Sequence, residues 1–598
     1  MKHYWRNDRV RSISPANVLE HINFLNQYDG TDYSDLTNHA NAFYNIHSGG
    51  NYFGAVVTHY NLLGLYELNN DNTITLSETA KLIANKNDLI TPFLEYFLLK
   101  FQFPRPHLNH NEEVTIPFLI ILKILLKLHE QNPSTSYLTK KEFYSLFNEQ
   151  AVRLKIDNID DSFIQNLSNN SRHWGINQPE ISGTDDLNYD KTLFCNSQFI
   201  NAEKLDYNNA NDFYIGLTKD IDKINFAKFV LNHYNNRFFN YNQNTASTQE
   251  KRDIKNKWSK YSNNKIEFLN YLNQKNMLQN SDSFRQYCNE RGFHFEETMI
   301  RRFLTSLSAK SFLLLTGISG TGKSKIAELF GQFMIQTNQG SFLMKAVGSN
   351  WNDNKNLLGY FNPIIGNGTY VDTDLVRYIR EANVNPDKTY IFLLDEMNLS
   401  YTERYFSDFL SALESLNKDI ILPDGTVIYW SNNLKVIGTI NEDETTHTLS
   451  PKVIDRANII EMNGSLPSVY IAGLIARNDA KIQNLITKDW NEAFISHLDS
   501  IYEALEGKFG YRTIDEISNY VIINVEFTGK DYLEFLDEQV YQKLLPKLHG
   551  TRGEILEKLE KLQSILNTPE YIFASSNIKV IAMINQVRKT GFTSFVTA

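Results

Sequence analysis

The chain has 598 residues, of which 42% are hydrophobic and 21% charged, and its formal net charge is −10. This length exceeds one ordinary hydrophobic core, so we expect roughly three or four domains, and the composition is that of a globular protein in water. The acidic balance excludes a surface that is basic throughout, although a local basic groove for nucleic acid stays compatible with it. Cys195 and Cys288 provide neither a disulfide framework nor zinc-binding spacing, which fits a reducing compartment.

No segment has the pattern of a membrane span. The start, "MKHYWRNDRV", is charged and lacks the apolar stretch of a signal peptide. The most apolar window, 114–131, is interrupted by Lys123 and Lys127 and is shorter than the ~20 apolar residues that a spanning helix needs. We therefore expect a buried helix in this window, no contact with a membrane and a cytoplasmic protein.

Residues 1–160 alternate helical patterns with short β signals. The stretch "LYELNNDNTITLS" (65–77) predicts a hairpin of two alternating strands around an Asn/Asp-rich turn, and "ETAKLIANK" after it predicts a helix. Helices beside a hairpin favour a winged-helix-like module, and a small α+β packing module is the alternative.

Residues 161–300 are rich in Asn, Asp, Tyr and Phe, and their pattern predicts a loop over 168–190, a junction over 234–248 and helices elsewhere. The segment "KRDIKNKWSKYSNNK" (251–265) has six basic residues interleaved with aromatic ones. Such a segment can bind phosphates and stack on bases, which makes this region a candidate DNA- or partner-binding module. The alternative is a solvated helix face with one aromatic packed inward. The candidate nucleic-acid contacts are Lys255, Lys257, Trp258 and Lys260.

From residue 301 the pattern predicts an α/β domain. Short, continuous apolar runs at 312–317, 390–396 and 434–441 alternate with helical segments. Strands that are buried on both faces and separated by helices indicate a parallel sheet with helices on both sides. We place this core at 301–465 and a helical region at 466–598.

The turn after the first of these runs, "GISGTGKS", has the spacing G-x-x-x-x-G-K-[ST] of a P-loop. Glycines let successive backbone N–H groups point inward at phosphate oxygens, and the following helix adds its positive end. Lys323 is expected to reach the β- and γ-phosphates, and Ser324 to ligate Mg²⁺. The expected nucleotide-binding residues are Gly317, Ile318, Ser319, Gly320, Thr321, Gly322, Lys323 and Ser324.

Two further strands end in polar residues. Asp395 and Glu396 follow four apolar residues, at the edge where ligands bind in open α/β sheets. Asp395 is expected to hold Mg²⁺, and Glu396 to orient and polarise the attacking water. Asn441 ends the third strand, where an amide can contact the γ-phosphate or hold that water.

Two arginines follow. In ring-forming ATPases an arginine at the position of Arg456 is offered to the nucleotide of the neighbouring subunit and stabilises transition-state charge. The alternative for Arg456 is a salt bridge at a helix end. Arg512 begins a helix of the C-terminal region, from which it can sense the γ-phosphate.

This ordered set of motifs resembles the AAA+ class, and within it the McrB-type branch. The likeness is carried by "GISGTGKS", "SNWNDNKNLLGYFNP" (349–363), "LLDEMNLS", "INEDETTHTLSPKVIDRAN" and, in the lid, "LDEQVYQKLLPKLHG" (536–550). It implies a hexameric ring NTPase that uses Mg²⁺ and ATP or GTP. It further implies a motor of modification-dependent restriction and anti-phage defence, which binds DNA through its N-terminal region and recruits a separate, McrC-like nuclease.

The sequence departs from the McrB signature Met-Asn-x-x-Asp, which stands here as 440–444 with Ile440 and Glu444, and the arginine-rich run is reduced to Asp455-Arg456. ATP and GTP therefore both remain open. Residues 1–300 show no acidic pair with a nearby lysine on adjacent strands, so DNA cleavage would need the partner. A MoxR-like protein-remodelling ATPase and a regulatory switch are the alternative functions.

Overall fold

The computed structural model describes residues 13–43, 63–102, 116–139, 142–143, 159–169, 193–204, 213–234, 237–239, 247–362, 364, 369–415, 417–442, 447–476, 480–568 and 571–598. The chain divides into two compact units, Met1–Asn280 and Ser281–Ala598. The expected boundary at 160/161 falls inside the first unit, because one hydrophobic cluster runs from Ile13 to Leu272. The expected boundary at 300/301 falls inside a helix of the second unit, Glu297–Ala309.

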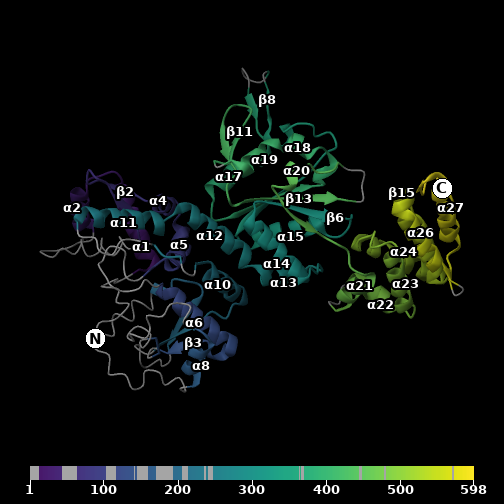
Figure 1. Cartoon of the computed structure of the whole chain (residues 1–598), viewed down its shortest axis with the longest axis horizontal. Helices are drawn as coiled ribbons and strands as arrows, with labels where there is room; N and C mark the ends of the chain where they lie inside the picture. The colour runs from purple at the N-terminus through teal and green to yellow at the C-terminus, as the bar shows by residue number, and fades with distance from the viewer. Residues whose placement is uncertain are drawn as a thin grey trace. The chain divides into compact units, whose positions relative to one another are not determined.

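The first unit is mainly helical, and its N-terminal part contains a hairpin set among helices (Figure 1). The predicted hairpin is confirmed, since its strands pair antiparallel from Tyr66 opposite Leu76 to Leu68 opposite Ile74. The predicted helix after it is also confirmed, and the hydroxyl of Ser77 caps it by accepting the Ala80 N–H. The elements of this part are α1 (Pro15–Gln27), α2 (Tyr33–Phe43), β1 (Tyr66–Leu68), β2 (Ile74–Leu76), α4 (Glu78–Asn85), η1 (Asn87–Leu89) and α5 (Ile90–Leu98).

The rest of the first unit adds a three-stranded antiparallel sheet in the order β3-β5-β4 and more helices. The predicted buried helix is confirmed as α6, most of whose residues are buried. The loop expected over 168–190 lies almost wholly outside the described residues, as does most of the junction at 234–248. The elements are α6 (Pro117–Gln131), η2 (Pro133–Thr135), β3 (Tyr137–Thr139), α8 (Asp161–Asn169), β4 (Ile200–Lys204), β5 (Phe213–Leu217), α10 (Ile221–Tyr234), α11 (Thr248–Ser262) and α12 (Lys265–Leu278).

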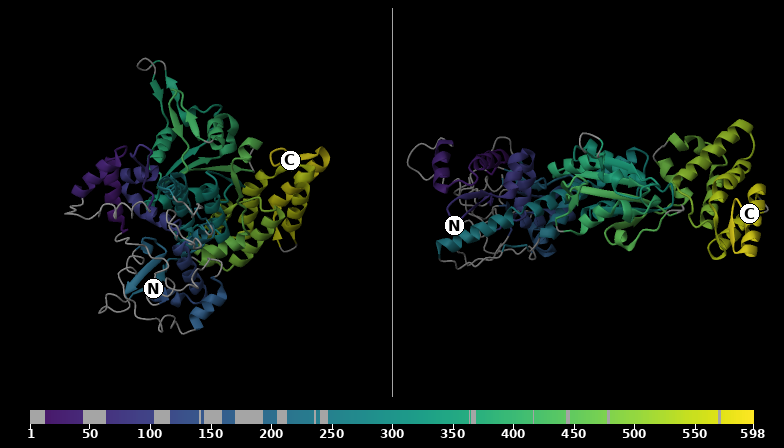
Figure 2. Two further views of the ribbon diagram at one scale, coloured as in Figure 1. Left: turned by 60° about the vertical axis from the view of Figure 1, so that its left-hand side comes forward. Right: turned by 90° about the horizontal axis from the view of Figure 1, so that it is seen from above.

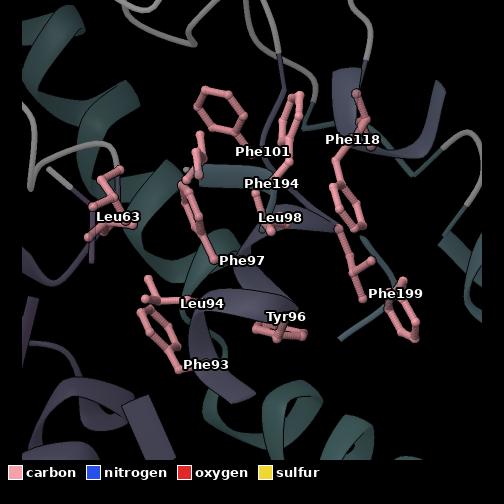
Figure 3. Packing of buried hydrophobic residues seen from close by; sticks show 14 of the residues in the cluster. Leu63, Phe93, Leu94, Tyr96, Phe97, Leu98, Phe101, Phe118, Phe194 and Phe199 are labelled. Atoms are coloured by element: carbon pink, nitrogen blue, oxygen red, sulfur yellow. The ribbon is translucent and has the colours of Figure 1, made fainter. Parts of the chain in front are cut away.

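Aromatic rings from segments distant in sequence fill the core of the first unit (Figure 3). Phe118 of α6 packs on Phe194, with ring centroids 5.8 Å apart. Glu95 of α5 has a buried carboxylate, which accepts hydrogen bonds from the Tyr271 hydroxyl and, at 2.9 Å, from the Lys275 ammonium of α12. Each buried Phe contributes about 1.5–3 kcal/mol to folding. These contacts explain why the first 280 residues form one unit.

The second unit contains a five-stranded parallel sheet in the order β14-β6-β13-β10-β7. The three predicted strands are confirmed as β6, β10 and β13, and every residue of β13 is buried, as expected for a central parallel strand. Strand β13 lies between β6 and β10, so the carboxyl ends of these three strands meet at one edge. The strands are β6 (Phe312–Gly317), β7 (Gly340–Ala346), β10 (Thr389–Asp395), β13 (Leu434–Asn441) and β14 (Asn458–Glu461).

Helices cover both faces of this sheet, with α14 and α15 on one side and α17 to α19 on the other (Figure 1). Two hairpins, β8–β9 and β11–β12, project from the core (Figure 2). The elements are α13 (Ser281–Glu290), α14 (Glu297–Ala309), α15 (Lys323–Gln336), α16 (Lys355–Leu358), β8 (Tyr360–Asn362), β9 (Thr369–Val371), α17 (Asp374–Val384), η5 (Met397–Leu399), α18 (Thr402–Tyr405), α19 (Ser407–Glu414), β11 (Asp419–Ile421), β12 (Val427–Tyr429) and α20 (Pro451–Ile454).

The C-terminal part of the second unit, hereafter the lid, is helical and has a hydrophobic core of its own, from Ile471 to Val587. In the part of the chain that the structure describes, no helix combines the length and the apolar content needed to cross a bilayer. The lid consists of α21 (Pro467–Ala476), α22 (Ala480–Ile486), α23 (Asn491–Ala504), α24 (Tyr511–Thr528), α25 (Tyr532–Gln539), η6 (Val540–Leu544), η7 (Leu545–Lys547), β15 (His549–Thr551), α26 (Arg552–Leu566), β16 (Asn567–Thr568), β17 (Tyr571–Ile572), α27 (Ala574–Thr590) and β18 (Phe592–Ser594).

Candidate nucleotide-binding site

The P-loop connects the end of β6 to the start of α15. Gly320 and Gly322 have φ angles of 83° and 94°, a left-handed backbone that glycine adopts without steric cost. At Gly317 space is limiting as well, since an added Cβ would lie 2.5 Å from the Met462 carbonyl oxygen. The Thr321 hydroxyl donates to the Ile318 carbonyl at 3.0 Å and stabilises the turn. The sequence thus produces a curled backbone of the kind that binds phosphate.

Lys323 is the first residue of α15, and its side chain lies against the loop with 5% exposure. The ammonium donates to the carbonyl oxygens of Gly317 at 2.8 Å and Ile318 at 2.6 Å. A positive charge is therefore held at the start of the loop, against the Gly317 and Ile318 carbonyls, by the first residue of α15. This arrangement suits a phosphate chain.

The next residue along α15 contacts the end of β10. The Ser324 hydroxyl donates to Asp395 Oδ1 at 2.5 Å, and the Thr439 hydroxyl of β13 donates to the same oxygen at 2.7 Å. The hydroxyl of Ser324 and the carboxylate of Asp395 are hard oxygen donors, and Mg²⁺ is usually held by one or two such groups together with water and phosphate. The described residues contain no cluster of three or more metal-binding side chains. The oxygen donors of Ser324 and Asp395 fit a Mg²⁺ ion whose remaining ligands would be water and nucleotide phosphate.

Glu396 follows Asp395 and has an unusual backbone. Its φ is 54° and its ψ 49°, a left-handed conformation that costs of order 1–3 kcal/mol outside glycine. Its N–H donates to the Thr439 hydroxyl at 2.9 Å, and the Asn441 amide lies 3.4 Å from Glu396 Oε1. The Asn398 amide in turn donates to the Asn441 carbonyl at 3.2 Å. The predicted pair Glu396 and Asn441 is thus brought together.

Thr439 and Asn398 were not among the residues predicted from the sequence. A signal for Thr439 was available, because it lies two residues before Asn441 on a strand and therefore points to the same side. Asn398 belongs to the segment "LLDEMNLS" that carries the family likeness, but no local pattern indicates its contact with Asn441. Glu444, the last residue of the signature, lies outside the described residues.

The lid reaches the P-loop through the start of α24. A Cβ added to Gly510 would lie 2.6 Å from the carbonyl carbon of Gly320, and the Cβ of Arg512 would lie 3.2 Å from a Cβ added to Gly320. Arg512 is exposed. The structure therefore places this predicted lid arginine beside the P-loop of its own chain.

Arg456 makes the contacts that its alternative interpretation predicts. Its guanidinium pairs with Glu414 of α19 at 2.5 Å and also donates to the Lys452 carbonyl. Its side chain is 16% exposed. In the single chain Arg456 is thus held in a salt bridge at the end of α20, and a role toward a neighbouring subunit stays a prediction.

Helix α11 contains the candidate nucleic-acid contacts. Lys255, Lys257 and Lys260 are exposed, and Lys260 pairs with Glu67 at 3.3 Å. Trp258 is only 3% exposed and packs on Phe239, with ring centroids 5.7 Å apart. The stacking role predicted for Trp258 is therefore not supported, because its indole is buried in the core of the first unit. The alternative, a solvated helix face with one aromatic packed inward, describes α11 correctly.

Comparisons with known protein families match three segments of the chain. Residues 312–457 match the AAA domain (dynein-related subfamily), and residues 57–259 match the N-terminal domain of the restriction endonuclease BpuJI. Residues 471–592 match a domain of unknown function (DUF8727). No curated protein matches the chain. The parallel sheet, the P-loop and the first match together define an AAA+ ATPase domain, which is a P-loop NTPase of the hydrolase class.

Proposed function

We propose that this chain is the ring-forming motor of a McrB-type restriction system, which hydrolyses ATP or GTP and acts on DNA for a separate, McrC-like nuclease subunit. The observation that carries the enzymatic part is the network at one sheet edge, where Ser324 and Thr439 both donate to Asp395. Lys323 would bind the β- and γ-phosphates, and Ser324 with Asp395 would hold Mg²⁺. Glu396 would polarise the attacking water, which Asn441 would help to place.

The proposal that the target is DNA depends on a different observation. An AAA domain and a domain resembling the N-terminal part of a restriction endonuclease occur in one chain. The second match includes the hairpin β1–β2 and most of α11, where Arg252 and Asn256 donate to the Leu68 carbonyl of β1. Helix α11 is thereby fixed along the hairpin, and its four lysines, Lys251, Lys255, Lys257 and Lys260, are exposed. Such a defence system would act in the cytoplasm, as a homo-oligomer that we expect to be hexameric.

One observation favours the second candidate, a MoxR-like ATPase that remodels a protein client. The burial of Trp258 removes the base-stacking contact that would have distinguished α11 from an ordinary charged helix. A client protein would then take the place of DNA on the first unit. Hydrolysis stimulated by DNA supports the motor of a restriction system, and hydrolysis stimulated by a protein client supports this alternative.

The test is hydrolysis of ATP and of GTP by the purified chain, with and without duplex DNA, and with Lys323→Ala as the inactive control. We expect Mg²⁺-dependent turnover of at least one nucleotide, stimulation by DNA, and plasmid that stays uncut because the nuclease is a separate subunit. Absence of turnover would overturn the enzymatic proposal, and cleavage by this chain alone would overturn the partner model.

A further inference from the structure

We propose that Thr439 is a positioning residue, whose single hydroxyl fixes both the carboxylate that holds Mg²⁺ and the glutamate that activates water. This inference rests on the proposed roles of Asp395 and Glu396. Thr439 lies on β13, which contains neither the P-loop nor the Asp395-Glu396 pair. Through its hydroxyl, the position of the Asp395 carboxylate and the position of the Glu396 backbone depend on one another.

The hydroxyl of Thr439 uses both of its capacities at the site. It donates to Asp395 Oδ1 at 2.7 Å and accepts the Glu396 N–H at 2.9 Å. A hydroxyl has one donor hydrogen and two acceptor lone pairs, so the two bonds are compatible. Threonine can therefore hydrogen-bond the Asp395 side chain and the Glu396 backbone at the same time. Valine has the same shape but no hydroxyl, so it can make neither bond.

The surroundings make these bonds hard to replace. Thr439 is 1% exposed and lies on β13, whose neighbours on both sides are the P-loop strand β6 and the strand β10 that ends in Asp395. Water has little access, so loss of the hydroxyl would take away the acceptor of a part-buried N–H rather than exchange it for solvent. Such a loss costs about 1–3 kcal/mol. The cost falls on the backbone of Glu396, the residue with a left-handed φ of 54°.

The consequences for chemistry follow from what each bond restrains. Two donors, Ser324 and Thr439, hold Asp395 Oδ1, which fixes the orientation of the carboxylate that would hold Mg²⁺. The bond from the Glu396 N–H fixes the backbone from which the water-activating side chain extends. Because one hydroxyl makes both bonds, its removal should weaken the Mg²⁺ site and slow the hydrolytic step together.

Two pairs of variants isolate the hydroxyl. Thr439→Val keeps the shape and removes the hydroxyl, whereas Thr439→Ser keeps the hydroxyl and removes the methyl group. Thr439→Ala and Thr439→Ser differ mainly in the hydroxyl, so this second pair serves if valine prevents folding. Thr389→Val is the matched control, because Thr389 is buried at the opposite end of β10 and its hydroxyl has no hydrogen-bond partner among the described residues.

We expect Thr439→Val and Thr439→Ala to lower kcat by about 10- to 100-fold, as loss of a ligand-orienting partner typically does, and to raise the Mg²⁺ concentration for half-maximal activity. The KM for nucleotide should change much less. Thr439→Ser should recover most of the activity and the parental Mg²⁺ requirement, and Thr389→Val should behave as the parent in both. A merely structural role would lower thermal stability without shifting the Mg²⁺ requirement.

The inference is overturned if Thr439→Val and Thr439→Ala keep the parental kcat and Mg²⁺ requirement, or if Thr439→Ser is as impaired as Thr439→Ala. Failure of the proposed function is distinguishable, since it would appear as a parental chain without turnover. In that case the Mg²⁺ dependence of nucleotide binding replaces kcat as the readout. A shift of that dependence in Thr439→Val, absent in Thr439→Ser, supports the inference, and no shift overturns it.

Discussion

At the scale of single residues, Glu396 combines a strained backbone with a nearby amide. Its left-handed φ of 54° occurs between the end of β10 and the start of η5, and Asn441 lies 3.4 Å from one carboxylate oxygen. A strained residue at a sheet edge persists only where its surroundings hold it. Here the Thr439 hydroxyl accepts its N–H, and the preceding residue, Asp395, accepts a hydrogen bond from Ser324 of α15.

The first prediction concerns Glu396→Gln. The amide keeps the size of the side chain but cannot act as a base, so nucleotide should bind while turnover falls by about 10²-fold or more. Turnover and binding of a fluorescent nucleotide measure the two effects. Glu328→Gln on α15, whose carboxylate pairs with Lys325 at 3.1 Å, is the control. Parental turnover in Glu396→Gln would contradict the water-polarising role.

Lys435 of β13 is a buried cation, 3% exposed, and no carboxylate among the described residues offsets its charge. Burial, together with the nearby charge of Lys418, lowers the pKa of Lys435 from 10.5 to about 7. Between pH 7 and 10.5 the unfolded chain therefore holds a proton that the folded chain has lost. The free energy of unfolding should rise with pH through this window, by up to about 1.4 kcal/mol per pH unit.

The second prediction is that Lys435→Met stabilises the core near pH 7 and removes this pH dependence, because methionine fills a similar volume without a charge to bury. Thermal melting of parent and variant at about pH 7 and about pH 9 measures it. The difference between the two proteins should shrink as the pH rises. Lys355→Met, at an exposed lysine of α16, should leave the pH dependence as it is. A Lys435→Met protein that is destabilised near neutral pH would contradict the account.

At the scale of elements, the helices and strands that could be predicted from the sequence are the ones with strong local patterns. The continuous apolar runs of β6, β10 and β13, the turn chemistry of the β1–β2 hairpin and the apolar length of α6 were sufficient, because each pattern depends on neighbouring residues. The bridge made by Thr439 could not be predicted with the same certainty, since it joins residues 44 positions apart. The extent of the first unit likewise depends on long-range packing, as of Phe118 on Phe194.

The orientation of α11 could have been predicted better. Ile254, Trp258 and Ser262 are spaced by four residues, so they lie on one helix face, and all three are buried. The lysines at 255, 257 and 260 fall on other positions and are exposed. Helical periodicity therefore separates the buried tryptophan from the solvated charges, and it outweighs the aromatic-basic composition of the segment.

The third prediction tests this exposed face. Neutralising Lys255, Lys257 and Lys260 together should weaken binding to duplex DNA, and the log–log salt slope should fall by ~0.9 for every phosphate that the helix no longer neutralises. Hydrolysis without DNA should persist. The control removes the same charge from the lid by changing Lys530, Lys543 and Lys561, each paired with a glutamate. An unchanged salt slope in the α11 variant would remove this helix from the DNA path.

At the scale of the whole molecule, Arg456 connects the single chain to the proposed ring. Its salt bridge to Glu414 occupies the guanidinium in the isolated chain. To act on a neighbour's nucleotide, Arg456 must leave this carboxylate. If Arg456 acts between subunits, its replacement should lower turnover far more than replacement of Glu414. If Arg456 serves only the salt bridge, the two replacements should have the same effect on turnover.

The fourth prediction is that Arg456→Ala lowers turnover by ~10³-fold while nucleotide binding survives, because an arginine finger contributes to the transition state. Glu414→Gln should keep turnover. Mixing Arg456→Ala with Lys323→Ala protein should restore part of the activity, since each supplies what the other lacks, and a fluorescent label reports subunit exchange. Equal losses in Arg456→Ala and Glu414→Gln, without recovery on mixing, would leave Arg456 as a structural residue.

The contact between Gly510 and the P-loop limits how closely the lid can approach the P-loop. The φ of Gly510 is −98°, which any residue can adopt, so glycine is required there for distance alone. Its added Cβ would meet the Gly320 carbonyl oxygen at 2.7 Å and that of Ser319 at 2.8 Å. The backbone of Gly510 therefore packs directly against the backbone of Ser319 and Gly320. The size of the side chain at position 510 sets the shortest possible distance between the lid and the P-loop.

The fifth prediction follows from this spacing. The series Gly510→Ala, Gly510→Val and Gly510→Leu should lower turnover progressively, because each step moves Arg512 further from the loop while the residues of the core stay intact. Stopped-flow measurement of nucleotide release should show faster release along the same series. Gly553→Ala, at a glycine of α26 where an added Cβ would meet nothing within 4 Å, is the control for substitution in the lid. A graded response would show how closely the backbone at position 510 must approach the backbone of the P-loop before the phosphate bond is hydrolysed.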